Sequence, residues 1–283
     1  MDPRDGLPPP GHLVQHRQEG RIPGTHPLPG ISGAGVTVGC DRPAPVRQAP
    51  ARQAPARHPG PDPDPRLEIA GLTALSTCDW PGRLVATVFL QGCPWRCGYC
   101  HNPELLDPRT PGRVPWPRVI DLLRRRRGLL DGLVFSGGEP TRQPGLATAM
   151  EVVRELGFGV GLHTAGAYPG RLAAVLPLVD WVGLDVKALP DGYPAVTGIG
   201  SGADKAFASL RLVLDAGVEH EVRVSVDPAL HTEGGVWRLV ELLTRSGVRR
   251  IVLQQVRRPD GSASAPLPVL IAPPRGVRVR RAE

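Results

Sequence analysis

Six short apolar segments recur between residues 83 and 256, and each is bounded by glycine, proline or charged residues. The segments are rich in β-branched residues and lack the regular apolar and polar alternation of a strand with one solvated face. Nearly continuous apolar runs of this length are typical of parallel strands that are buried on both faces. We therefore predict six buried strands, at residues 83–92, 132–140, 159–166, 181–189, 220–228 and 249–256.

Segments with helical periodicity lie between these apolar runs. They are found at residues 119–126, 144–156, 171–176, 203–216 and 235–246. Strands that alternate with helices form a parallel sheet that the helices cover. The eight repeats of a complete barrel do not fit comfortably in this length. The pattern predicts an α/β fold with an open parallel sheet, in the form of a partial (βα)6 TIM-like barrel.

The first 66 residues differ from the rest in composition. They contain 15 of the 34 prolines and no Phe, Trp or Tyr, and they include the tandem QAPARQAPAR at residues 48–57. Such a segment cannot bury enough apolar surface to offset the entropy that is lost on ordering. We predict a disordered Pro- and Arg-rich tail at residues 1–66 and one folded domain at residues 67–283.

Charge and hydropathy limit the partners that we expect. The formal net charge is +7, of which the tail accounts for +2, with eight arginines and six acidic residues. We expect no nucleic-acid partner, because no aromatic side chains are interleaved with the arginines of the tail. We expect no membrane span, because no run of about eighteen apolar residues is present. The N-terminus has no apolar leader, and we therefore expect a cytoplasmic protein.

Three of the five cysteines lie within eight residues, after the first predicted strand. Cys93, Cys97 and Cys100 have the spacing C-x3-C-x2-C, and clustered thiols in a reducing compartment are typical of a metal site. A structural zinc site commonly uses four protein ligands, but Cys40 and Cys78 stand alone in the sequence. An iron–sulfur cluster normally takes four thiolates. Three cysteines on one loop therefore indicate a cluster with one iron open to another ligand. A non-catalytic zinc or electron-transfer protein is the alternative.

Polar residues also follow the ends of the later predicted strands. In chain order they are SGGEPT at 136–141, His163, Asp185, Lys187 and Arg223. The carboxyl ends of parallel strands meet at one edge of the sheet, where α/β folds bind their ligands. We expect these side chains and the three cysteines to form one active site.

Several of these segments resemble a known family. The cysteine spacing, with Tyr99 before the last cysteine, and the GGEP after the second strand are similar to those of the radical S-adenosylmethionine (SAM) superfamily. DWPGRLVATVFLQGCPWRCGYCHNPEL (79–105), GLDVKA (183–188) and VDPALHTE (226–233) further resemble the proteins that activate anaerobic ribonucleoside-triphosphate reductase, within the glycyl-radical-enzyme activases. The resemblance covers residues 67–255, nearly all of the predicted domain.

The resemblance implies a set of cofactor ligands. The three cysteines would each bind one iron of a [4Fe-4S] cluster, and the fourth iron would bind the amino and carboxylate groups of SAM. The GGEP segment would contact the methionine amino group, and Tyr99 would lie against the adenine. The full set of residues expected to bind SAM is Tyr99, Gly137, Gly138, Glu139, Asp185, Lys187, Arg223 and His231.

Some of these residues have a structural alternative. Asp185 and Lys187 are two positions apart on a strand, so they could form an ion pair with each other. Lone histidines such as His163 and His231 are more often hydrogen-bonded structural residues than ligands. We expect Cys78, which stands where similar sequences carry an aliphatic residue, to be a small buried hydrophobic side chain.

The resemblance also implies protein partners. They are a glycyl-radical enzyme, specifically an anaerobic ribonucleotide reductase, and an electron donor such as flavodoxin or ferredoxin. A partly open barrel with short loops and no lid domain has a lateral gap through which a partner's glycine loop could enter. The alternative is a radical SAM enzyme that acts on a small molecule, similar to carboxy-deazaguanine synthase.

We predict that the anaerobically reconstituted protein binds four iron and four sulfide per chain, because one loop with three thiolates matches a cubane with one open iron. Replacing Cys93, Cys97 or Cys100 with alanine should abolish reductive cleavage of SAM. Iron and acid-labile sulfide analysis tests the cluster. Stoichiometric zinc in the wild type, without charge-transfer absorbance, would contradict it.

Overall fold

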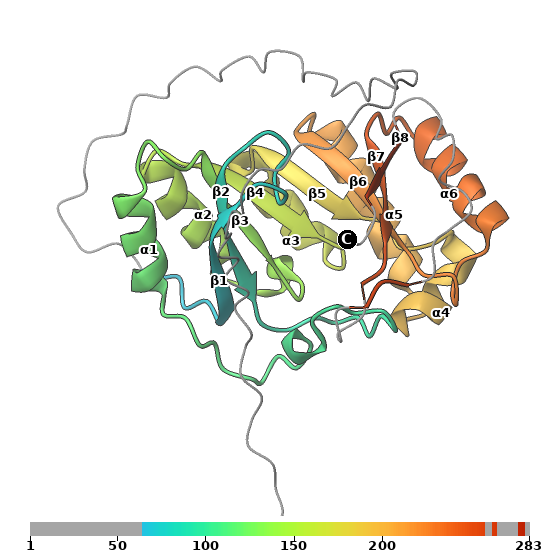
Figure 1. The fold of residues 1–283 in the computed structure, drawn as a ribbon, viewed down its shortest axis with the longest axis horizontal. Helices are drawn as coiled ribbons and strands as arrows, with labels where there is room; N and C mark the ends of the chain where they lie inside the picture. Colours follow the sequence, from blue (N-terminus) through green and yellow to red (C-terminus); the bar gives the residue numbers. More distant parts are fainter. Residues whose placement is uncertain (1–63, 258–261, 265–276, 281–283) are drawn as a thin grey trace, which may run out of the picture. The chain divides into compact units, whose positions relative to one another are not determined.

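An eight-stranded sheet organises the structure, a computed structural model that describes residues 64–257, 262–264 and 277–280. The strands lie in chain order across the sheet (Figure 1). The first pair is antiparallel, and every later pair is parallel. The strands are β1 (Ile69–Ser76), β2 (Val85–Leu90), β3 (Gly132–Gly137), β4 (Gly159–Thr164), β5 (Trp181–Asp185), β6 (Glu219–Val226), β7 (Ile251–Gln255) and β8 (Val277–Arg280).

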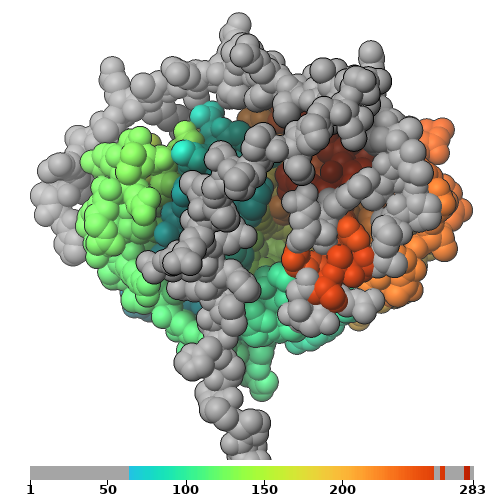
Figure 2. Space-filling model, viewed as in Figure 1, coloured from blue at the N-terminus to red at the C-terminus, as the bar shows by residue number. Residues whose placement is uncertain are grey.

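Helices connect the parallel strands. They are α1 (Trp116–Arg125), α2 (Leu146–Glu155), α3 (Pro169–Val175), α4 (Tyr193–Thr197), α5 (Gly202–Asp215) and α6 (Glu233–Arg245). α1 and α2 lie at one end of the curved sheet and α6 at the other (Figure 1). In the space-filling view, the green residues and the orange residues of these two ends lie on opposite sides (Figure 2). Within the described part of the chain, no helix is long and apolar enough to cross a membrane.

The structure confirms the predicted α/β partial barrel, with all six predicted strands, and adds a strand at each edge of the sheet. β1 is half-exposed along much of its length, so its residues do not form the apolar run of a buried strand. β8 is a four-residue VRVR segment near the Pro- and Arg-rich end of the chain, beyond the last of the six predicted strands. The predicted tail lies outside the described residues, except for residues 64–66.

A small aromatic cluster fills the inside of the curved sheet below the strand ends. The rings of Trp80 and Trp181 stack with centroids 5.8 Å apart, and Val85 and Val134 complete the cluster. Alternate residues of a strand point to the same face, so Trp181 lies on the face that Asp185 shares four residues later. The polar ends of the strands therefore stand above an apolar floor.

We predict that Trp181→Ala lowers the free energy of unfolding by about 3–5 kcal/mol, because it leaves a cavity in this floor. Leu129→Ala is a suitable control, since the Leu129 side chain is 63% exposed and its loss should cost less than about 0.5 kcal/mol. Urea denaturation followed by circular dichroism measures both. Equal stability of the two variants would mean that the tryptophan stack does not support the sheet.

Candidate functional site

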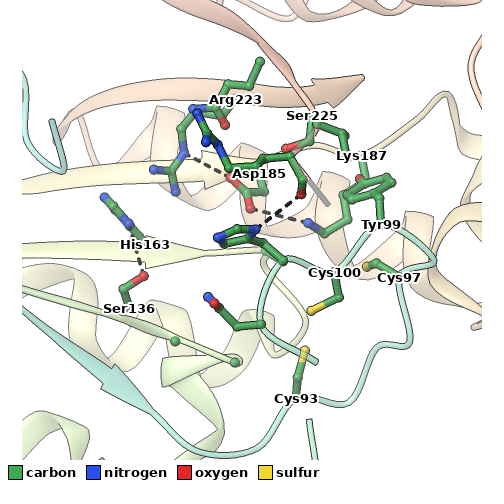
Figure 3. A pocket seen from close by; sticks show the side chains of 18 of the residues that line it. Cys93, Cys97, Tyr99, Cys100, Ser136, His163, Asp185, Lys187, Arg223 and Ser225 are labelled. Atoms are coloured by element: carbon green, nitrogen blue, oxygen red, sulfur yellow. Dashed lines mark hydrogen bonds and ion pairs between the residues drawn. The ribbon is translucent and has the colours of Figure 1, made fainter. Parts of the chain in front are cut away.

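A cavity of about 650 Å³ lies at the carboxyl ends of the parallel strands. A pocket of this volume is in the range that holds a cofactor or small substrate. Of the residues expected to bind the cluster or SAM, those that line it are Cys93, Cys97, Tyr99, Cys100, Gly137, Gly138, Asp185, Lys187 and Arg223. Glu139 and His231, the other two of this set, are not among its lining residues. The strand ends thus bring together side chains that are far apart in the sequence (Figure 3).

The cysteine loop is fixed where it leaves β2. Gln91 is buried, and its side-chain amide donates hydrogen bonds to the backbone oxygens of Glu104 (2.9 Å) and Asp107 (3.0 Å). The amide of Gln143, beyond the next strand, donates to the backbone oxygen of Gln91 at 3.1 Å. These bonds close the loop on itself and attach its base to the following segment of the barrel.

The middle of the cysteine loop is fixed against α4. Trp95 is buried between the first two cysteines, and its ring meets that of Tyr193 edge-on, with centroids 5.9 Å apart. The Arg96 backbone N–H donates to the oxygen of Thr197 at 2.9 Å. The short helix α4, which the sequence pattern did not reveal, is therefore part of the support of the cysteine loop.

The cysteine side chains are suited to a cluster of several irons. Their sulfurs face a common space in the cavity (Figure 3). Within the described ranges, no three His, Cys, Asp or Glu side chains are arranged to hold one metal ion. A [4Fe-4S] cluster distributes its thiolates over separate irons, and three thiols that face one space fit this requirement. Burial raises the pKa of Cys93 to about 12 and also raises the pKa of Cys97. Binding of a cationic metal centre favours the thiolate form of these side chains.

Asp185 organises the cationic side of the cavity. Its carboxylate accepts a hydrogen bond from Arg223 Nε at 3.0 Å and lies 3.4 Å from Lys187 Nζ (Figure 3). Burial alone would raise the pKa of Asp185, but the two cations hold it below its usual range. One carboxylate thus faces two buried cations, which leaves positive charge at this wall for an anionic ligand group. The ion pair between Asp185 and Lys187, one of the two sequence alternatives, is present, and both residues line the cavity.

The hydroxyl group of Tyr99 bears on whether the cavity accommodates a polar ligand. This group is buried and has no hydrogen-bond partner within the described residues. Lys187 Nζ lies 5.8 Å from the centre of the Tyr99 ring. Buried polar groups are nearly always satisfied, so an unpartnered hydroxyl at a cavity wall is consistent with a polar ligand that completes the site.

Glu139 supports the cavity wall from behind. Its fully buried carboxylate accepts hydrogen bonds from Thr141 Oγ1 (2.5 Å), Thr164 Oγ1 (2.7 Å) and the Ala165 backbone N–H (2.9 Å). Thr164 and Ala165 line the cavity, whereas Glu139 itself does not. The structure therefore shows that Glu139 positions Thr141, Thr164 and Ala165. The expected contact of Glu139 with SAM stays a prediction.

His231 has a similar supporting position. Its Nε2 atom lies 2.8 Å from the backbone oxygen of Lys187, and its Nδ1 atom lies 3.1 Å from the backbone oxygen of Asp227. These contacts fix the backbone of Lys187, as the structural alternative for this histidine implies. The expected contact of His231 with SAM stays a prediction.

His163 is buried in the cavity wall. Its Nε2 atom donates to the backbone oxygen of Asp79 at 2.7 Å, and Ser136 Oγ lies 3.3 Å from Nδ1. Burial, together with the nearby charge of Arg223, lowers its pKa to about 3, so the ring is neutral. His163 thus connects the β1–β2 loop to the strand ends.

The expectation for Cys78 was wrong. Its side chain is exposed rather than buried, and together with Asp79 it lines the cavity from the β1–β2 loop. Similar sequences carry an aliphatic residue at this position, which suggested burial. The exposure of Cys78 could not be foreseen, because the β1–β2 loop turns away from the core. Gln254 and Arg280, also in the lining, were missed because isolated polar residues near a chain end carry no motif.

The match to a protein-family model identifies the superfamily of this chain. The model of the radical SAM superfamily matches residues 87–243, which is more than half of the chain. The chain belongs to the radical SAM superfamily. A solved structure of a radical SAM methyltransferase from Sphaerobacter thermophilus shares the fold, with a TM-score of 0.55 at 18% identity, over 71% of this chain and 67% of that one.

Curated relatives place the chain in the activase branch of the superfamily. Pyruvate formate-lyase-activating enzyme from Clostridium pasteurianum is 32% identical over 168 residues, 57% of this chain and 69% of that protein. A candidate glycyl-radical enzyme activating enzyme from Methanocaldococcus jannaschii is 35% identical over 132 residues, 44% of this chain and 52% of that protein. 7-Carboxy-7-deazaguanine synthase from Thermococcus kodakarensis is 29% identical over 178 residues, 55% of this chain and 69% of that protein.

Radical SAM enzymes use a [4Fe-4S] cluster and SAM, and the residues of this cavity fit both. Cys93, Cys97 and Cys100 would hold the cluster, and the cationic wall at Lys187 and Arg223 suits the carboxylate of SAM. When bound, the cluster supplies the electron that cleaves the sulfonium of SAM to methionine and a 5′-deoxyadenosyl radical. The protein provides position and shielding for this chemistry.

We predict that Asp185→Asn weakens SAM binding about tenfold or more and leaves the iron content intact. The substitution removes the charge that holds Lys187 and Arg223 in place, but it does not touch the cysteine loop. Equilibrium binding of SAM and iron analysis measure the two effects. Asp191→Asn, at an exposed position just after β5, is the matched control. If Asp185→Asn lost iron and Asp191→Asn did not, the cluster subsite and the SAM subsite would not be separate.

Proposed function

We propose that this radical SAM activase generates a glycyl radical on a partner enzyme, and that the partner is an anaerobic ribonucleoside-triphosphate reductase. Two of the relatives, a pyruvate formate-lyase-activating enzyme and a candidate glycyl-radical enzyme activating enzyme, support an activase. The segments around the cysteines and GLDVKA, which resemble activators of the anaerobic reductase, support the specific partner.

The main support for a protein partner is that the cavity extends to both edges of the sheet. Its lining includes Cys78 and Asp79, which follow the edge strand β1, and Arg280, which lies in the opposite edge strand β8. Within the described residues, β1 pairs with β2 and β8 with β7, and these two edges do not pair with each other. The cavity therefore reaches the side where the sheet is open, as entry of a protein loop requires.

The residues of this chain would bind, orient and enclose the reactants. Lys187 and Arg223 present cations to the anionic end of SAM, and Asp185 keeps both in place. The partner's glycine would approach between the sheet edges, and its loop would complete the cavity and exclude water. The overall result would be transfer of one hydrogen atom from the Cα of that glycine to the 5′-deoxyadenosyl radical, which leaves a glycyl radical and 5′-deoxyadenosine.

We propose flavodoxin or ferredoxin as the electron donor. Arg96 and Gly98 are exposed residues of the cysteine loop that do not line the cavity, so a donor can approach the cluster from the outside of this loop. The partner and the electron donor would then meet the enzyme on different sides of the cysteine loop.

A second candidate function is chemistry on a small molecule. The 29% identity to a 7-carboxy-7-deazaguanine synthase, over 69% of that protein, is the observation in its favour. The two candidates differ in the substrate that stimulates SAM cleavage and in the fate of the radical.

We expect a doublet glycyl signal by electron paramagnetic resonance when the reduced protein, SAM and an anaerobic ribonucleotide reductase are mixed without oxygen. A reductase in which the radical glycine is replaced with alanine is the matched control and should give no doublet. If the wild-type reductase also gives none, while a small metabolite accelerates cleavage of SAM, the small-molecule function is correct instead.

A further inference from the structure

Three polar residues of neighbouring strands form a row on the inner face of the sheet. Ser225 of β6 pairs in register with Gln254 of β7, and Gln254 pairs in register with Arg280 of β8. Paired residues of adjacent strands share a face, and adjacent strands lie about 4.8 Å apart, so the row spans about 10 Å. All three residues line the cavity.

The row leads from the predicted SAM subsite to the open side of the sheet. Ser225 lies two positions after Arg223, on the same face of β6, and Arg280 belongs to the edge strand. Neither the cysteine motif nor GGEP includes any member of the row. The row therefore lies between the predicted SAM subsite and the β8 edge of the sheet.

Two side chains of the row have polar groups that are not bonded to any described residue. The side chains of Ser225 and Gln254 are half-buried, and neither makes a hydrogen bond to another described residue. A hydroxyl group and a carboxamide each both donate and accept hydrogen bonds. A carboxamide matches a peptide group in particular, because it can accept from the N–H and donate to the C=O of an extended chain.

The charge of the row is balanced. Arg280 Nη2 lies 3.2 Å from Glu221 Oε1, and the Glu221 side chain is only 3% exposed. Glu221 therefore offsets the charge of Arg280 and orients its guanidinium group, whose remaining N–H groups are donors for a carbonyl oxygen. A neutral wall of donors and acceptors favours a peptide backbone over an anionic metabolite.

We infer that Ser225, Gln254 and Arg280 form a binding row for the main chain of an extended peptide segment of the partner enzyme, next to its radical glycine. This inference rests on the proposed function and identifies how the partner is recognised. Main-chain recognition holds the segment in one register, so that one residue of it reaches the reactive end of the cavity.

The first test measures glycyl-radical formation by the reconstituted, full-length protein against the concentration of anaerobic ribonucleotide reductase. Gln254→Leu keeps the size of the side chain but removes its donor and acceptor, and we expect it to raise the KM for the reductase about tenfold, with kcat changed much less. Gln254→Glu, which removes the donor and adds a negative charge, should also raise KM. Arg278→Gln is the matched control on the same face of β8, outside the cavity lining, and should leave KM unchanged.

The second test separates main-chain from side-chain recognition. The probe is a synthetic peptide that spans the radical glycine of the reductase, with each backbone N–H methylated in turn. At one position near the glycine, methylation should weaken binding to the wild type about tenfold and have little further effect on Gln254→Leu, because both changes remove the same hydrogen bond.

The outcomes distinguish this inference from the proposed function. If the wild type activates the reductase but both Gln254 variants have its KM, the row does not bind the partner, and the inference is wrong while the activase function stands. Methylation effects that are equal in wild type and Gln254→Leu would also overturn main-chain recognition by Gln254. If the wild type forms no glycyl radical on the reductase, the proposed partner and the inference both fail.

Discussion

The geometry of the site depends on how closely the backbones of β2 and β3 approach at their ends. Gly138 N–H donates to the Leu90 oxygen, and Glu139 N–H donates to the Gly92 oxygen, both at 2.9 Å. A Cβ atom on Gly137, whose φ is +121°, would lie 2.2 Å from the Leu90 nitrogen, and one on Gly138 would lie 2.4 Å from the Gly92 oxygen. Only glycine permits this contact, which directs the cysteine loop over the cavity.

The site keeps polar groups in places where folding alone does not favour them. Asp185 faces two buried cations, and the Tyr99 hydroxyl is buried without a partner among the described residues. Buried charges and unsatisfied hydroxyl groups cost folding free energy, and such costs are typical of sites that a ligand completes. The apolar floor of Trp80 and Trp181 and the hydrogen-bonded carboxylate of Glu139 stabilise the frame that holds these groups in place.

The sequence predicted the parts of the protein whose physical signal is local. Continuous apolar runs revealed the six buried strands, and the spacing of the cysteines revealed the cluster loop. β1 and β8 have mixed exposure at the sheet edges, so periodicity could not identify them. The GGEP motif placed Glu139 near the site but could not show that its carboxylate turns toward Thr164, behind the wall. The row that ends at Arg280 depends on strand register, which no local pattern encodes.

We propose that Cys93, Cys97 and Cys100 hold a [4Fe-4S] cluster whose fourth iron is open to SAM. Electron paramagnetic resonance of the reduced cluster, recorded with and without SAM, is the decisive experiment. If SAM binds the open iron, the g values of the reduced cluster should shift on its addition, and Asp185→Asn should require more SAM for the same shift. A reduced cluster whose spectrum is the same at saturating SAM would contradict the account, because SAM would then bind away from the cluster.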